Sequence, residues 1–185
     1  MFSIQLMRRY QPSRLAKALW IGVSLLLITI QANSAHAQEL WRGATVGMTQ
    51  KQVQSLFPGA AFGSHERVAS GATEELRAEE EIAGAPFTAN FYFRNDGLLE
   101  IVLDRAEIMN TRPADAHNTF VQMREDFARA YGPASNCQVG RNINMVESCD
   151  WESTSTSVTL IHFDVQDQPL LLKAIFRKPS DPGRR

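Results

Sequence analysis

Serine, histidine and cysteine are the residues of this chain whose types and spacing could do chemistry. Ser64, His65 and Glu66 place a hydroxyl, an imidazole and a carboxylate side by side. The members of a hydrolytic triad meet through the fold and seldom through adjacency, so we interpret this tripeptide as a polar loop. The sequence contains neither G-x-S-x-G nor S-x-x-K, the nucleophile patterns of common serine hydrolases. We therefore predict no catalytic residue and no enzyme activity.

Metal and cofactor sites are not predicted either. His65, His117 and His162 fall on different predicted elements, and no pair has the H-x-x-x-H or H-E-x-x-H spacing of a helical zinc site. The glycines mark turns and helix ends and form no phosphate-binding loop. The acidic run at residues 74–81 contains no histidine and is typical of a solvated face.

The two cysteines predict one structural disulfide. Cys137 and Cys149 are the only cysteines, and in an exported chain such a pair most simply forms a bridge. It would close a loop of about 13 residues and stabilise the fold by on the order of 3 kcal/mol. A redox-active or metal-binding pair is the alternative, which the lack of C-x-x-C spacing and of a nearby histidine disfavours.

The first 37 residues predict export. Four basic residues lie between positions 8 and 17, an apolar run from Ala18 to Ile30 follows, and the segment ends on Ala35-His36-Ala37. This is the pattern of a signal peptide, cleaved here after Ala37. The apolar run has 13 residues, fewer than the roughly 20 that cross a bilayer. No cysteine follows it for a lipid anchor, so we expect a soluble periplasmic or secreted bacterial protein without a membrane span.

The charge of the exported chain disfavours nucleic acid as a partner. Removing the signal takes away four basic residues and no acidic one, so the formal net charge falls from −1 to about −5. A protein that binds nucleic acid needs a basic surface to contact the phosphate backbone.

Residues 38–185 are long enough for one domain with a hydrophobic core. The last residues, 179–185, are expected to be a disordered tail.

Two amphipathic helices are predicted. Thr49 and Gln52 form a capping box for a short helix that ends at Leu56-Phe57-Pro58-Gly59. A longer helix opens at Pro113 and ends at Tyr131-Gly132-Pro133. Its apolar side chains recur every three or four residues, at positions 116, 120, 123, 127 and 131.

Alternating patterns predict the strands. Residues 87–93 alternate apolar and polar side chains, Asn95-Asp96-Gly97 signals a tight turn, and residues 98–104 form the partner strand. The run 74–82 has a helix-forming composition, but its apolar residues have a period of two, which favours a strand. Further strands are expected at residues 150–152, 158–165 and 170–177.

The helix and hairpin signals recur at an offset of about 70 to 74 residues, which indicates a duplicated unit. We therefore predict an α+β fold of two tandem helix-plus-antiparallel-sheet repeats, at residues 38–110 and 111–178, with the helices packed on one face of the sheet.

The segment Gly43-Ala44-Thr45-Val46-Gly47-Met48-Thr49, with Val53 and Leu56-Phe57-Pro58-Gly59 after it, resembles the opening of small bacterial envelope proteins of the SmpA/OmlA kind. These are similar in fold to the tandem-repeat β-lactamase inhibitory proteins. The resemblance implies a sheet whose open face binds another protein, either an enzyme being inhibited or an envelope assembly. Two departures limit it, since the chain has no lipobox cysteine and only one cysteine pair.

A partner face follows from the predicted alternation. If Phe91, Phe93 and Ile101 face the helices, the neighbouring side chains face outward. Aromatic and charged side chains together suit a protein interface. The predicted partner face comprises Tyr92, Leu98, Glu100, Val102, Trp151, His162 and Lys173.

These expectations together predict a non-catalytic module that binds another envelope or secreted protein. The plain alternatives for the predicted face are a solvated sheet without a partner and a face that the two repeats use against each other. Two alternative functions stay open: a periplasmic carrier of a small ligand or lipid, since two apolar sheet faces could line a pocket, and an envelope hydrolase with an unrecognised site. The identity of the partner and the oligomeric state do not follow from the sequence.

Overall fold

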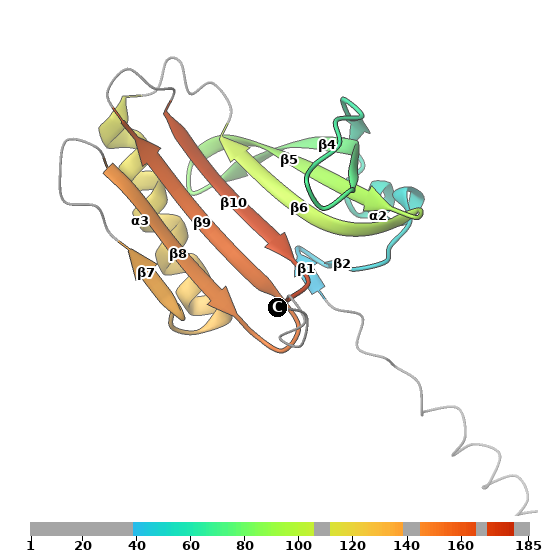
Figure 1. The fold of residues 1–185 in the computed structure, drawn as a ribbon. Helices are drawn as coiled ribbons and strands as arrows, with labels where there is room; N and C mark the ends of the chain where they lie inside the picture. Colours follow the sequence, from blue (N-terminus) through green and yellow to red (C-terminus); the bar gives the residue numbers. More distant parts are fainter. Residues whose placement is uncertain (1–38, 106–111, 139–144, 166–169, 180–185) are drawn as a thin grey trace, which may run out of the picture. The chain divides into compact units, whose positions relative to one another are not determined.

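One antiparallel sheet of eight strands dominates the structure, in the order β3-β4-β5-β6-β10-β9-β8-β7 (Figure 1). The computed structural model describes residues 39–105, 112–138, 145–165 and 170–179. The predicted signal peptide and almost all of the predicted tail lie outside these described residues. The elements are β1 (Glu39–Trp41), β2 (Ala44–Thr45), α2 (Gln50–Leu56), β3 (Ala61–Phe62), β4 (Thr73–Ile82), β5 (Ala85–Arg94), β6 (Gly97–Arg105), α3 (Pro113–Tyr131), β7 (Asn136–Gln138), β8 (Met145–Glu152), β9 (Ser157–Asp164) and β10 (Leu171–Arg177).

The predicted fold class is wrong. About half of the described residues are in strands, which belong mainly to the eight-stranded sheet, and only two helices are described. Strand β6 pairs directly with β10, so the strands before and after α3 form one continuous sheet. The fold is therefore mostly β, and the prediction of two helix-plus-sheet repeats is corrected to a single large sheet. The recurring helix and turn signals depend on neighbouring residues alone, so they did not predict which distant strands pair with each other.

Local signals were more informative than the offset between them. Thr49 and Gln52 form both hydrogen bonds of the predicted capping box at the start of α2. Asn95 and Asp96 both have positive φ, 52° and 61°, in the two-residue turn between β5 and β6. The acidic run forms β4, as its period of two predicted. Neither of the two described helices is long and apolar enough to span a membrane.

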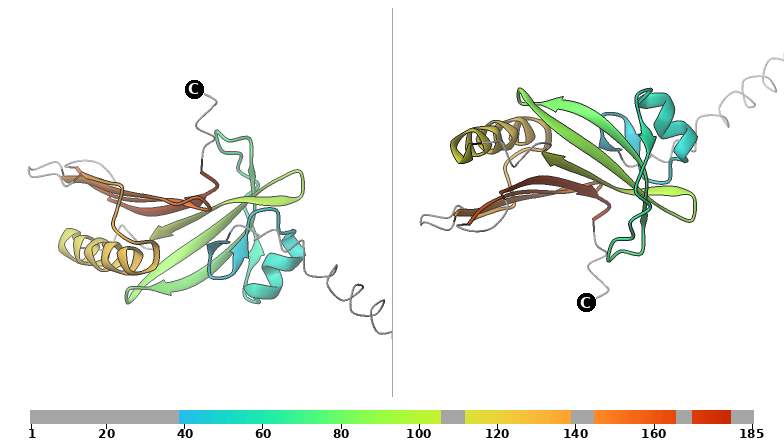
Figure 2. Two further views of the ribbon diagram at one scale, coloured as in Figure 1. Left: turned by 90° about the horizontal axis from the view of Figure 1, so that it is seen from below. Right: turned by 90° about the horizontal axis from the view of Figure 1, so that it is seen from above.

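Helix α3 supplies much of the core. Pro113 stands at its first turn, and Ala116, Phe120, Met123 and Phe127 are buried as the predicted spacing requires. Figure 2 shows α3 alongside one face of β8, β9 and β10, which we call the inner face. On β9 and β10 the even-numbered residues from 158 to 162 and from 172 to 176 are buried, so they point to the inner face.

The opposite side of these three strands, the outer face, is only partly buried. Every second residue of each strand lies on this face, and residues that pair across the three strands form rows. These residues are Val146, Ser148 and Asp150 on β8, Thr159, Ile161 and Phe163 on β9, and Leu171, Lys173 and Ile175 on β10. Beyond β10 the outer face continues over β6 and β5, where Tyr92 and Val102 form a small second cluster with Ala72. Residues before β4 therefore cover this part of the outer face.

Candidate functional site

The predicted partner face does not exist as one surface. Tyr92, Glu100, Val102 and Lys173 do lie on the outer face, as their strand register requires. However, Tyr92 and Val102 are buried, and Glu100 and Lys173 are half-buried. Only the two charged residues of these four are therefore accessible to a partner.

The other three predicted residues belong to the core and not to a partner surface. Leu98, Trp151 and His162 are 1%, 2% and 0% exposed. Trp151 donates a hydrogen bond from Nε1 to the carbonyl oxygen of Gly132 at 3.1 Å. On β8 and β9, Trp151 and His162 alternate with the residues of the outer face and so point to the inner side.

A β-bulge explains the error at Leu98. Phe93 pairs with Leu98, whereas Tyr92 pairs with Glu100, so Leu99 is an extra residue on β6. An extra residue shifts the alternation of side chains by one position. Leu98 is consequently placed in the core with Phe93, while the strict alternation assumed from the sequence put it on the outer face.

Tyr92 lies in an acidic, largely buried environment. Burial raises the pKa of its hydroxyl to about 12, and the negative charges of Glu74 and Asp104 act in the same direction. Burial also raises the pKa of Glu100, and the positive charges of Arg177 and Lys173 oppose that change. This part of the outer face therefore favours protonated groups.

The hydroxyl of Tyr92 gives a test of this environment. A tyrosine in an unfolded chain ionises near pH 10, and folded Tyr92 at about 12, so only the folded state keeps the proton between these values. This contribution to stability is complete below pH 10 and is lost as the pH rises to 12. We expect Tyr92→Phe to flatten the decline of the unfolding free energy over that range, measured by urea titration at several pH values. A tyrosinate absorbance step near pH 10 that is missing in Tyr92→Phe would contradict this burial.

The side chains of Ser64 and His65 contact strand β4 and not each other. The hydroxyl of Ser64 donates to Glu74, and Nδ1 of His65 lies 3.1 Å from Oε2 of Glu75, so neither side chain is bonded to the other. The side chain of His65 is 63% exposed. The arrangement fits the polar loop that the sequence predicted.

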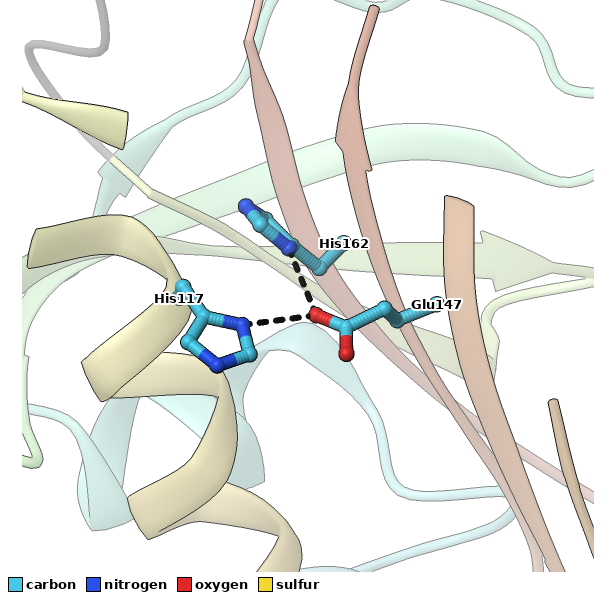
Figure 3. Close-up of side chains that lie close together, drawn as sticks. All are labelled: His117, Glu147 and His162. Atoms are coloured by element: carbon cyan, nitrogen blue, oxygen red, sulfur yellow. Dashed lines mark hydrogen bonds and ion pairs between the residues drawn. The ribbon is translucent and has the colours of Figure 1, made fainter. Parts of the chain in front are cut away.

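The structure brings together two histidines that the sequence had separated. Glu147 on β8 pairs in register with His162 on β9, and His117 approaches from α3. Nδ1 of His117 and Nδ1 of His162 lie 2.9 and 3.0 Å from the same atom, Oε2 of Glu147 (Figure 3). The side chains of Glu147 and His162 are 1% and 0% exposed, and that of His117 is 38% exposed.

Sequence reasoning missed this cluster because it tested spacing within single helices. The three residues are separated by 30 and 15 positions, and only the pairing of β8 with β9 and the position of α3 join them. A polar residue that continues an alternating row of apolar side chains, as His162 does after Val158 and Leu160, was an available signal in the sequence.

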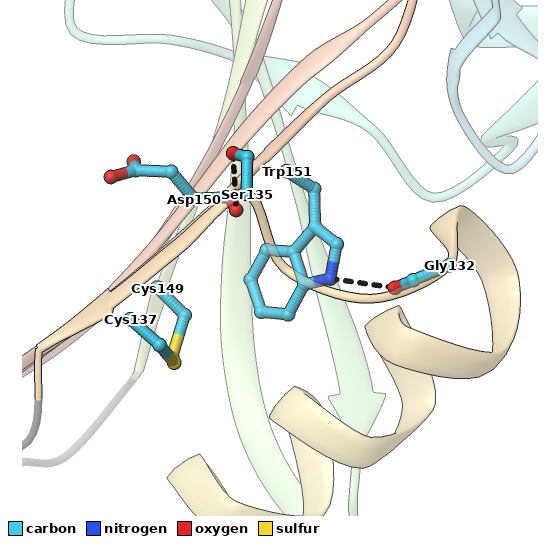
Figure 4. The surroundings of a disulfide bond; sticks show 6 residues. All are labelled: Gly132, Ser135, Cys137, Cys149, Asp150 and Trp151. Atoms are coloured by element: carbon cyan, nitrogen blue, oxygen red, sulfur yellow. Dashed lines mark hydrogen bonds between the residues drawn. A yellow bond between two sulfur atoms is a disulfide. The ribbon is translucent and has the colours of Figure 1, made fainter.

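The disulfide joins the edge strand β7 to β8. Cys137 and Cys149 are bonded and are register partners, with their Cα atoms 4.1 Å apart (Figure 4). Next to the bridge, the backbone nitrogen and the hydroxyl of Ser135 both donate to the carbonyl oxygen of Asp150. The sequence prediction of one structural disulfide agrees with this geometry, which is compatible with an oxidising extracellular compartment.

Comparison with known proteins identifies no relative. No protein-family profile matches the chain, and neither a curated protein nor a solved structure is significantly similar to it.

Proposed function

We propose that this protein is an exported, non-catalytic module that binds another envelope or secreted protein through the outer face of β8, β9 and β10. The observation that carries the proposal is a row of partly exposed apolar side chains across three paired strands. Val146 pairs with Phe163, and Phe163 pairs with Leu171. Val146 is 45% exposed, and Phe163 and Leu171 are half-buried.

Polar groups border this row in a way that suits a protein interface. In the next row of the register Ile161 pairs with Lys173, whose Nζ lies 3.1 Å from Oδ1 of Asp104. In the row after that, Thr159 donates to Asp150 at 2.8 Å. An apolar centre with a polar rim is the usual anatomy of a protein-binding patch. A folded partner of this chemistry is favoured over a lipid, because the rim carries both charge signs within one narrow sheet.

The proposed location outside the cytoplasm rests on two supports. The residues before Ala37 have the pattern of a signal peptide, and the bridge between Cys137 and Cys149 is of the kind that persists in oxidising compartments. The resemblance of the Gly43–Gly59 segment to SmpA/OmlA-like envelope proteins agrees with both, and we propose that kinship together with the location.

A crosslinking experiment in the exporting cell tests the binding function. A photoreactive residue at Ile161, in the middle of the outer face, is expected to capture one discrete protein. The matched control places the same residue at Glu125, which is exposed on α3. The captured protein is then purified, and its dissociation constant for the wild-type chain is compared with that for Phe163→Asp.

Two results decide between binding and its alternatives. We expect Phe163→Asp to weaken the affinity at least tenfold, the effect of about 1.4 kcal/mol, while Phe62→Asp at an exposed aromatic on β3 leaves it unchanged. Equal capture from Ile161 and Glu125, or equal affinity of both variants, would reject this face as the binding site. A small ligand retained in native mass spectrometry without any protein adduct would favour the carrier function.

A further inference from the structure

Two histidines from separate elements meet one buried carboxylate between α3 and the sheet (Figure 3). The possible ligand atoms of His117, Glu147 and His162 all lie within 4.8 Å of one another. We propose that these three side chains bind one zinc ion, which joins α3 to β8 and β9. This site is independent of the outer face, because it lies on the opposite side of the sheet.

Glu147 needs a positive charge nearby. A buried carboxylate is strongly unfavourable unless it is paired, and its ion-pair partners among the described residues are two histidines and no lysine or arginine. Both imidazoles approach the same oxygen, Oε2. A divalent cation bound to this oxygen would neutralise the carboxylate, and neutral imidazoles are the form that ligates metal.

His162 is also not explained as an ordinary core histidine. Its side chain is fully buried, and its Nδ1 lies 3.0 Å from Oε2 of Glu147. Its Nε2 has no hydrogen-bond partner among the described residues. Buried polar atoms in proteins are nearly always paired, so a fully buried imidazole with one unpaired nitrogen calls for a specific role. Nδ1 is the ring nitrogen that faces the cluster, and holding it there is such a role. The ring of Phe120 lies against the imidazole, tilted by 34° at 5.8 Å between centroids, and so fixes its position.

The geometry of the cluster is close to that of a zinc site. Zinc bonds of 2.0 to 2.2 Å at tetrahedral angles put neighbouring ligand atoms roughly 3.3 Å apart. The two nitrogen-to-oxygen distances, 2.9 and 3.0 Å, need to open by a few tenths of an ångström. The two imidazole nitrogens lie within 4.8 Å of each other, and a turn of the half-exposed His117 ring would bring them to the separation that zinc requires. Two histidines and one glutamate leave the fourth position for water, and the half-exposed side of His117 gives the ion a path from solvent.

The ligand set also selects the metal. Two of the three donors are imidazole nitrogens, whereas calcium and magnesium are bound through oxygen, so these hard cations are disfavoured. Nickel and copper accept imidazole as well and bind such sites tightly, so we expect them to compete with zinc. Because the ligands come from α3, β8 and β9, the ion would act as a cross-link within the fold.

Zinc titration of the full chain, purified without a histidine tag and stripped with a chelator, tests the proposal. We expect one zinc ion per chain by calorimetry. At free zinc about 100-fold above the dissociation constant, the melting temperature should rise by about 5 to 10 °C. Cobalt(II) in place of zinc should give the visible absorption of a tetrahedral site. His117→Ala should weaken zinc binding at least about tenfold, because even partners outside the ligand shell contribute this much.

The matched control is His65→Ala, which removes an exposed histidine that also pairs with a glutamate, Glu75. It should leave zinc affinity and the cobalt spectrum unchanged. Glu147→Gln, which keeps the size of the side chain, is expected to lose both signals even though His117 and His162 remain. Equal zinc affinity in the wild-type chain, His117→Ala and Glu147→Gln would mean that the ion binds elsewhere and would overturn the proposal, as would the absence of saturable binding.

Discussion

Trp151→Ala is expected to lower the free energy of unfolding by about 3 to 5 kcal/mol, the usual cost of removing a large buried aromatic side chain. Trp151 is 2% exposed, and its ring packs edge-on against Phe127 at 5.6 Å between centroids. The change would also remove the hydrogen bond to the carbonyl oxygen of Gly132, which stands just after α3. Urea unfolding followed by circular dichroism measures the effect.

Two controls separate packing from other effects of this change. Trp151→Phe keeps most of the ring but removes the Nε1 donor, so we expect a smaller loss of about 1 to 2 kcal/mol. Phe62→Ala removes an aromatic side chain that is 74% exposed, and we expect a change within about 0.5 kcal/mol. Wild-type stability of Trp151→Ala together with lost partner capture would instead return Trp151 to the binding surface.

The sequence predicted those parts of the fold that depend on neighbouring residues. Thr49 and Gln52 cap α2, and Asn95 and Asp96 form the turn between β5 and β6, because each requires only local hydrogen bonds or a permissive backbone. The sequence did not predict that β6 would pair with β10. That pairing joins strands about 70 residues apart, and its register depends on side chains that are not neighbours in the sequence.

The candidate sites show the same limit at the level of single residues. Leu98 was misplaced because a bulge at Leu99 shifts the alternation. The nearby Gly97 belongs to the turn signal, and the bulge position itself holds an ordinary leucine. The cluster of His117, Glu147 and His162 depends on one cross-strand pair and on one turn of α3. Motif spacing detects sites built on one element, and it does not detect a site that three elements share.

Removing the disulfide is the second change with a large expected effect. Cys137→Ala with Cys149→Ala should lower the free energy of unfolding by about 3 kcal/mol, because the bridge closes a short loop and so restricts the unfolded chain. Alanine is preferred to serine, since Cys149 is fully buried and a hydroxyl there would lack a partner. Urea unfolding of the double variant, compared with the oxidised wild type, measures this loss.

The position of the disulfide predicts which strand is destabilised first when the bridge is removed. Strand β7 has three residues at the edge of the sheet, and its partner among the described strands is β8. The bridge is therefore its side-chain covalent link to the neighbouring strand. We expect amide hydrogen exchange in the double variant to accelerate in β7 while the central strands β5 and β6 keep their protection relative to the lowered global stability. Reduced wild-type protein should behave like the double variant. Uniformly faster exchange, or unchanged stability in both forms, would mean that the bridge neither anchors β7 nor restricts the unfolded chain.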